Sequence, residues 1–189
     1  MSVLLTASLS AALPLSAASH VDVVKMRTEN WVNPLGIGTS TPRFSWQITS
    51  DRKGVVQTSY QILVASSREK LDRNEADLWD SGERNSDEQL WIPYQGKALL
   101  SGAQAYWKVR ITTNKGKSEW TEPQLFTIGL LGETKWSGTW IGLEDLQPGE
   151  QKGMHTRLAA RYIRKDFAAK GKVKRALAYV AGLGVYEFY

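Results

Sequence analysis

The fold of this chain is decided by ENWVNPLGIGTSTPRFSWQI, residues 29–48, which joins a proline-glycine turn to a strand with paired aromatic residues. Pro34 fixes its φ at the first corner of a turn, and Gly36 can adopt the positive φ that a type II turn requires. Pro42 then opens a strand in which every second residue is apolar: Phe44, Trp46 and Ile48. This alternation predicts a β-strand with one apolar face and one solvent-facing side.

The rest of residues 21–128 repeats this pattern. Seven short β-like runs are separated by turn signals, which is the number expected of an immunoglobulin or fibronectin type III sandwich. They lie at residues 21–27, 43–49, 57–64, 78–82, 89–94, 106–112 and 120–128. The sequence therefore predicts an all-β domain.

Three local signals refine this prediction. Residues 67–77 begin with a serine and an acidic residue, which predicts one short helical turn. Pro93 cannot donate a ladder hydrogen bond and indicates an edge strand. Residues 114–117, NKGK, predict a hairpin. In the run at 57–64, Tyr60, Ile62 and Val64 form the inward face, with Gln61 and Leu63 on the other side.

The charge of the chain is divided unevenly. The net charge is +5, but residues 1–150 hold 15 Lys and Arg against 17 Asp and Glu, whereas residues 151–189 hold 9 against 2. The basic excess surrounds Gly171, as in a solvated hairpin end, and forms no stripe of the kind that binds nucleic acid. We therefore expect no nucleic-acid partner.

Metal and cofactor sites are not expected. The chain has no Cys, which excludes disulfides and thiolate ligands, and its two His, His20 and His155, are far apart. Gly182 and Gly184 lack the third glycine and the following helix of a dinucleotide site. The sequence thus predicts no cofactor and no metal.

The N-terminus resembles an export signal. Residues 1–18 are apolar and small and end in Ser-Ala-Ala before Ser19, as signal peptidase requires, although the first basic residue is Lys25. The run is too short to span a membrane and contains Pro14. We expect an exported bacterial protein, in the periplasm or outside the cell.

Several motifs together resemble the start of bacterial α-L-rhamnosidases of glycoside hydrolase family 78. They are NPLGI at residues 33–37, TPRFSW at 41–46, QTSYQILV at 57–64, DLWDSG at 77–82, YWKVR at 106–110 and WSGTWIG at 136–142. The resemblance implies an immunoglobulin-like domain at residues 19–128, a linker at 129–142, and the truncated start of a second β-sandwich at 143–189. Strands are expected there at 161–167 and 173–180.

The same resemblance implies hydrolysis of terminal α-L-rhamnosides by an inverting route, with the two carboxylates in an α/α toroid outside this chain. We assign no catalytic residue here, because Asp77, Asp80, Asp87 and Glu88 lie in turns and exposed strand ends, where solvated charge is usual. The expected partners are the missing C-terminal catalytic domains and, through them, rhamnose-containing glycans.

Two tryptophans are weak sugar-contact candidates. Trp136 and Trp140 could stack on a sugar ring, but their position at a domain junction favours packing in the seam between two sandwiches. Two functions stay open: a non-catalytic scaffold of a secreted α-L-rhamnosidase, or a stand-alone fibronectin-like carbohydrate-binding or adhesion module.

Overall fold

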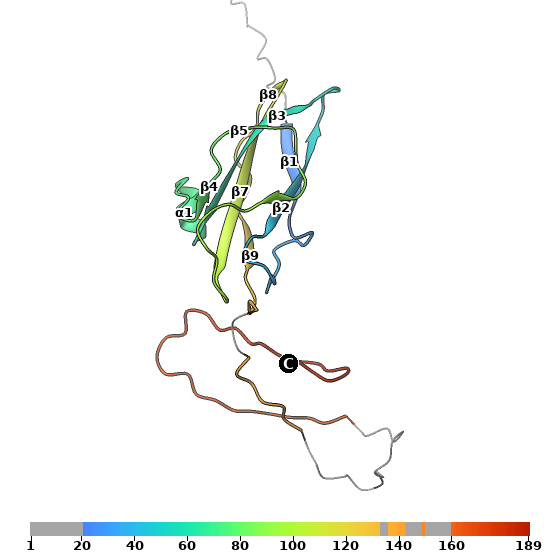
Figure 1. The fold of residues 1–189 in the computed structure, drawn as a ribbon, viewed down its shortest axis with the longest axis vertical. Helices are drawn as coiled ribbons and strands as arrows, with labels where there is room; N and C mark the ends of the chain where they lie inside the picture. The colour runs from blue at the N-terminus through green and yellow to red at the C-terminus, as the bar shows by residue number, and fades with distance from the viewer. Residues whose placement is uncertain (1–20, 133–135, 143–148, 150–159) are drawn as a thin grey trace, which may run out of the picture. The chain divides into compact units, whose positions relative to one another are not determined.

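A computed structural model describes residues 21–132, 136–142, 149 and 160–189 of the chain. The chain divides into two compact units, Met1–Trp136 and Ser137–Tyr189. All strands and the one helix of the described residues lie in the first unit (Figure 1). They are β1 (Val21–Thr28), β2 (Arg43–Ser50), β3 (Gln57–Ala65), α1 (Arg68–Asp72), β4 (Trp79–Asp80), β5 (Arg84–Asn85), β6 (Ile92–Pro93), β7 (Gln104–Thr113), β8 (Gly116–Lys117) and β9 (Gln124–Thr127).

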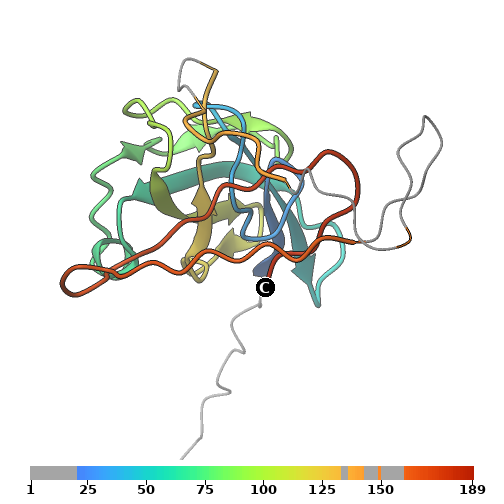
Figure 2. The ribbon, with the colours of Figure 1, turned by 90° about the horizontal axis from the view of Figure 1, so that it is seen from below.

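The strands form two antiparallel sheets. The smaller sheet has the order β1-β2-β6, and the larger has the order β4-β3-β7-β8, with β5 pairing with β3 and β9 pairing with β7. Figure 2 shows these strands from below, closer to end-on than Figure 1. This arrangement confirms the prediction of an all-β, immunoglobulin-like domain.

The core lies between the two sheets and is centred on Phe44 of β2. Its ring centroid lies 4.4 Å from that of Trp107 on β7, 5.8 Å from that of Phe126 on β9 and 6.3 Å from that of Trp79 on β4. Phe44 is fully buried. Because its three partners all belong to the larger sheet, the alternation in β2 directly determines how the two sheets pack.

A buried polar group orients the second aromatic residue of β2. The Trp46 indole Nε1 donates to Gln57 Oε1 at 3.0 Å, and Gln57 Nε2 donates to the carbonyl oxygens of Ser86 and Glu88 at 3.0 and 2.9 Å. Gln57 is only 2% exposed. Its amide therefore connects a strand of each sheet to the loop before β6, and it satisfies polar groups that would otherwise be costly to bury.

A smaller apolar cluster lies on the outer side of the larger sheet. Leu63 points away from the main core, as expected, yet it is buried with Ala65 and Leu71 because α1 covers that end of β3. The helix begins where predicted, with the Ser67 side chain accepting from the Lys70 backbone N–H. At its other end Lys108 Nζ donates to the Leu71 carbonyl at 2.5 Å.

Most other local predictions are confirmed. Among the described strands β6 pairs only with β2, as an edge strand containing Pro93 should, and the 114–117 hairpin joins β7 to β8. Gly36 has φ 77, as the turn requires. The short strand β5 was not predicted, because Arg84–Asn85, which pairs with Ser59 and Tyr60 of β3, carries no apolar alternation.

Residues 160–189 contain no strand in the structure, so the two strands expected at 161–167 and 173–180 are not formed. Large apolar side chains there are exposed, including Tyr162 at 90% and Phe167 at 88%. The physical reason is that an extended segment needs neighbouring strands for its backbone hydrogen bonds and a second layer for its apolar face. The second sandwich stays a prediction.

Two other expectations concern residues outside the described part. The signal peptide at 1–18 and most of the loop expected at 143–156 fall there. Among the described residues, no helix is sufficiently long and apolar to cross a membrane.

The Gln57 network predicts a large effect of a small change. Replacing Gln57 with Leu keeps the volume but leaves the buried Trp46 N–H without its acceptor, and we expect a loss of about 3 kcal/mol in the free energy of unfolding. Urea denaturation followed by tryptophan fluorescence measures it. Gln61→Leu on the same strand is the control, with an expected loss below about 1 kcal/mol. Equal losses for the two variants would contradict this role.

Candidate functional site

Asp77, one of the acidic residues of the first unit, has several structural partners. Lys70 Nζ donates to Asp77 Oδ2 at 2.6 Å, and the backbone and hydroxyl of Ser66 donate to the two oxygens of the same carboxylate at 2.9 and 2.7 Å. Burial of Asp77 opposes its ionisation, but these bonds outweigh burial and lower its pKa from 3.8 to about 2. Asp77 therefore ties the segment after α1 back to the end of β3.

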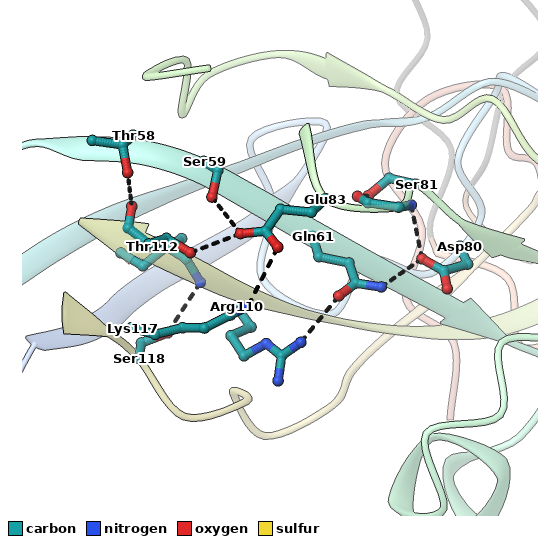
Figure 3. Close-up of polar contacts among 12 residues, drawn as sticks. Thr58, Ser59, Gln61, Asp80, Ser81, Glu83, Arg110, Thr112, Lys117 and Ser118 are labelled. Atoms are coloured by element: carbon teal, nitrogen blue, oxygen red, sulfur yellow. Dashed lines mark hydrogen bonds and ion pairs between the residues drawn. The ribbon is translucent and has the colours of Figure 1, made fainter. Parts of the chain in front are cut away.

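A second carboxylate, Glu83, belongs to a polar ladder on the outer face of β3 and β7 (Figure 3). It accepts from Ser59 Oγ at 2.8 Å and from Thr112 Oγ1 at 3.0 Å, and Lys117 Nζ lies 3.5 Å away. These two hydrogen bonds and the charge of Lys117 lower the pKa of Glu83. A glycosidase acid needs a raised pKa, so Glu83 is unsuited to donate a proton at neutral pH.

The same ladder continues along the two strands. Gln61 Nε2 donates to Asp80 Oδ1 at 2.9 Å, and Arg110 Nη2 donates to Gln61 Oε1 at 3.1 Å (Figure 3). The Arg110 guanidinium also lies 4.4 Å from the ring centre of Trp120. Gln61 thus connects β4 to β7 across β3, and such cross-strand pairs stabilise a sheet.

The loop of residues 29–39, called loop 29–39 below, is held against β9 over its second half. Asn33 Oδ1 accepts from the Leu125 N–H at 2.9 Å, and the Pro34 carbonyl accepts from the Thr127 N–H at 3.0 Å. Ile37 N then donates to the Thr127 carbonyl at 2.8 Å. These bonds form the start of a parallel pairing, seen as the bridge between Ile37 and Ile128.

The other end of loop 29–39 is held by charge. Arg43 Nε and Nη2 donate to the two oxygens of Glu29 at 3.0 and 2.7 Å, and these bonds from Arg43 lower the pKa of Glu29. The same guanidinium lies 4.2 Å from the ring centre of Trp91, whose backbone has φ 59. Both ends of loop 29–39 are therefore anchored.

Loop 29–39 nonetheless presents apolar side chains to solvent. A hollow of about 680 Å³ is lined by Glu29 and residues 31–39. Three of its lining residues are large, apolar and mostly exposed, at 70% for Trp31, 58% for Val32 and 76% for Leu35. We call these three residues the apolar patch. The loop itself lies at the end of the domain where β9 ends (Figure 1).

The two tryptophans predicted as weak sugar contacts lie at the linker. Trp136 is 49% exposed and Trp140 is 69% exposed. Trp136, which belongs to the first unit, is not among the residues that line the hollow of loop 29–39. The packing of the two tryptophans in a seam between two sandwiches stays a prediction.

The structure gives no sign of a metal site in its described part. No group of three His, Cys, Asp or Glu side chains that could hold an ion occurs among those residues.

The apolar patch was missed at the level of sequence. WVNPL, residues 31–35, was interpreted as part of a turn, and its signal was the density of large apolar residues in a segment that contains no strand alternation. Exposure of these residues depends on contacts with β9, about 90 residues later in the chain, and no local pattern reports them.

Comparison with known proteins identifies the first unit. Residues 23–132 match the family model of the Rha78A-like, N-terminal immunoglobulin domain. An α-L-rhamnosidase of Formosa agariphila is 36% identical over 172 residues, a match that covers 83% of this chain and 18% of that protein.

Two solved structures are also similar. The α-L-rhamnosidase of Streptomyces avermitilis, solved in complex with L-rhamnose, superposes with a TM-score of 0.61 at 36% identity, over 65% of this chain and 12% of that one. The α-L-rhamnosidase of Dictyoglumus thermophilum gives a TM-score of 0.61 at 33% identity, over 68% of this chain and 14% of that one. The chain thus spans less than a fifth of the length of these relatives.

The Asp77 network predicts a pH dependence of stability. Because the pKa of Asp77 is about 2 in the folded state and 3.8 is its ordinary value, its contribution is complete above about pH 4 and is lost as the pH falls through 2. Asp77→Asn should cost on the order of 1 kcal/mol at pH 7 and flatten the decline of stability between pH 4 and 2. Urea denaturation at several pH values measures this, with exposed Asp87→Asn as the control. A decline as steep as in the parent chain would contradict it.

The anchoring of loop 29–39 predicts intolerance at Gly129. A Cβ there would lie 2.9 Å from the Gly36 carbonyl oxygen and 3.1 Å from its carbon, and backbone atoms cannot rotate away. Gly129→Ala should cost about 2 kcal/mol of unfolding free energy. Gly132→Ala, where a Cβ meets no atom within 4 Å, is the control. Thermal denaturation compares the two variants, and equal melting temperatures would disprove the close approach of Gly129 to the Gly36 backbone.

Proposed function

Since the chain belongs to the family of Rha78A-like N-terminal immunoglobulin domains, we propose that it serves as the non-catalytic, N-terminal scaffold of an α-L-rhamnosidase. The activity, hydrolysis of terminal α-L-rhamnosides by an inverting route, belongs to residues outside this chain. The partners of the scaffold are the catalytic domains of the same polypeptide, which in turn bind rhamnose-containing glycans.

One observation carries this proposal. The relatives are α-L-rhamnosidases, and the portion that resembles this chain is only 12–18% of their length. A segment of that size, built on two sheets with an aromatic core, matches a single accessory domain better than a catalytic one.

The chemistry of the described carboxylates supports the same proposal. Glycoside hydrolysis needs one carboxyl group with a raised pKa facing a second carboxylate across the substrate. Asp77 and Glu83 instead have lowered pKa values and are engaged by hydrogen bonds from neighbouring side chains. They contribute to the fold and leave the reaction to other residues.

Export is part of the proposal. The apolar residues 1–18 and the Ser-Ala-Ala before Ser19 fit a signal peptide, so the enzyme would act in the periplasm or outside the cell, where plant glycans are accessible. N-terminal sequencing of the secreted protein tests this. A mature N-terminus at Ser19 is expected, and an intact Met1 on secreted protein would contradict it.

A second function is favoured by one feature, the exposure of Trp136 and Trp140. Exposed indoles are the usual platform for sugar rings, so a stand-alone carbohydrate-binding or adhesion module is the alternative. The two functions differ in what the 189-residue chain does by itself. Titration of this chain with L-rhamnose and rhamnosides distinguishes them: millimolar or tighter binding that Trp136→Ala and Trp140→Ala abolish would favour the module.

Enzyme assays provide the direct test. The 189-residue chain should show no turnover of an aryl α-L-rhamnoside, whereas the polypeptide encoded by the continued reading frame should hydrolyse it. Release of the aryl group measures both. Turnover by the purified 189-residue chain would overturn the scaffold proposal, as would an inactive longer polypeptide that is folded.

A further inference from the structure

The apolar patch on loop 29–39 is a feature of the domain that the scaffold function does not yet explain. We propose that Trp31, Val32 and Leu35 form the docking surface against which a later domain of the same α-L-rhamnosidase polypeptide packs. This inference rests on the function proposed above and adds to it the surface through which the scaffold acts.

The first argument is that the exposure is imposed by an ordered loop. Single exposed apolar residues are common on protein surfaces, but three within five residues that line one hollow are not. Backbone bonds to β9 and the bidentate contact between Glu29 and Arg43 keep the loop in place. The patch is therefore preorganised, which lowers the entropic cost of docking.

The second argument concerns what occupies the patch. Three side chains present a few hundred Å² of apolar surface, well below the roughly 800 Å² per partner of a stable complex between separate proteins. A tethered domain needs less, because the linker raises its effective concentration to the millimolar range. A partner within the same polypeptide is thus the occupant that this small surface can hold.

The position of the patch favours the same occupant. The Gly129 N–H donates to the Ile37 carbonyl at 2.8 Å, so the chain leaves β9 directly beside loop 29–39. A domain that follows in sequence therefore begins close to the hollow. Glu29 lines the hollow and is paired with Arg43, so a charged rim borders the apolar side chains, which fits an interface with an apolar centre and polar edge. The docking domain should present an apolar side chain to the hollow and polar groups to this rim.

The experiment compares one double variant, Trp31→Ser with Leu35→Ser, in two contexts. In the 189-residue chain the variant should leave the melting temperature unchanged, because both side chains are exposed there. In the polypeptide encoded by the continued reading frame, it should lower the melting temperature by a few degrees. There, it should also speed hydrogen exchange of the amides at residues 31–35 by at least about tenfold.

A matched control is Val56→Ser, at an apolar residue that directly precedes β3, is 53% exposed and does not line the hollow. It should be neutral in both contexts.

Three results would overturn the docking surface, and one of them would also overturn the proposed function. An active longer enzyme in which the double variant is neutral overturns the docking surface alone. A 189-residue chain that dimerises through the patch, shown by sedimentation and lost in the double variant, overturns it in favour of a second copy. A longer polypeptide that is folded but inactive overturns the proposed function, and the docking surface with it.

Discussion

Phe44 lies between the two sheets, and its ring contacts three aromatic residues of the larger sheet, the nearest with a centroid 4.4 Å away. The neighbouring Trp46 is held by Gln57, whose amide spans from β3 to the loop before β6. Burial of large rings provides the free energy of the core, and their edge and face geometry limits how the sheets can rotate on each other. The packing of the other strands depends on these contacts of Phe44 with the larger sheet.

Loop 29–39 shows how a packed sandwich can present a defined surface. β9 pairs with β7 in the larger sheet, and the loop pairs in turn with β9, so its apolar side chains are attached to the core through two layers of hydrogen bonds. Glu29 and Arg43 complete the anchor at the other end. A scaffold needs such a surface, because a flexible loop would have to be ordered at an entropic cost each time a neighbour docked.

The carboxylates Asp77 and Glu83 form hydrogen bonds that stabilise the fold. Carboxylates such as Asp77 and Glu83 accept hydrogen bonds that favour their charged forms, whereas catalysis in a glycosidase requires at least one carboxyl group to stay protonated near neutral pH. The direction of these pKa shifts agrees with the non-catalytic role proposed for this domain.

Sequence by itself determined the strands of the first unit other than β5, the helical turn after Ser67 and the positive φ at Gly36, because alternation, capping and turn chemistry act over a few residues. It also identified the family through ordered motifs. It overestimated the strands at 161–167 and 173–180, where pattern alone cannot provide neighbouring strands. Only the tertiary structure decided that Leu63 is covered by α1 and that Trp31 is exposed. These outcomes depend on contacts such as that of Asn33 with Leu125, 92 residues apart, which local patterns do not encode.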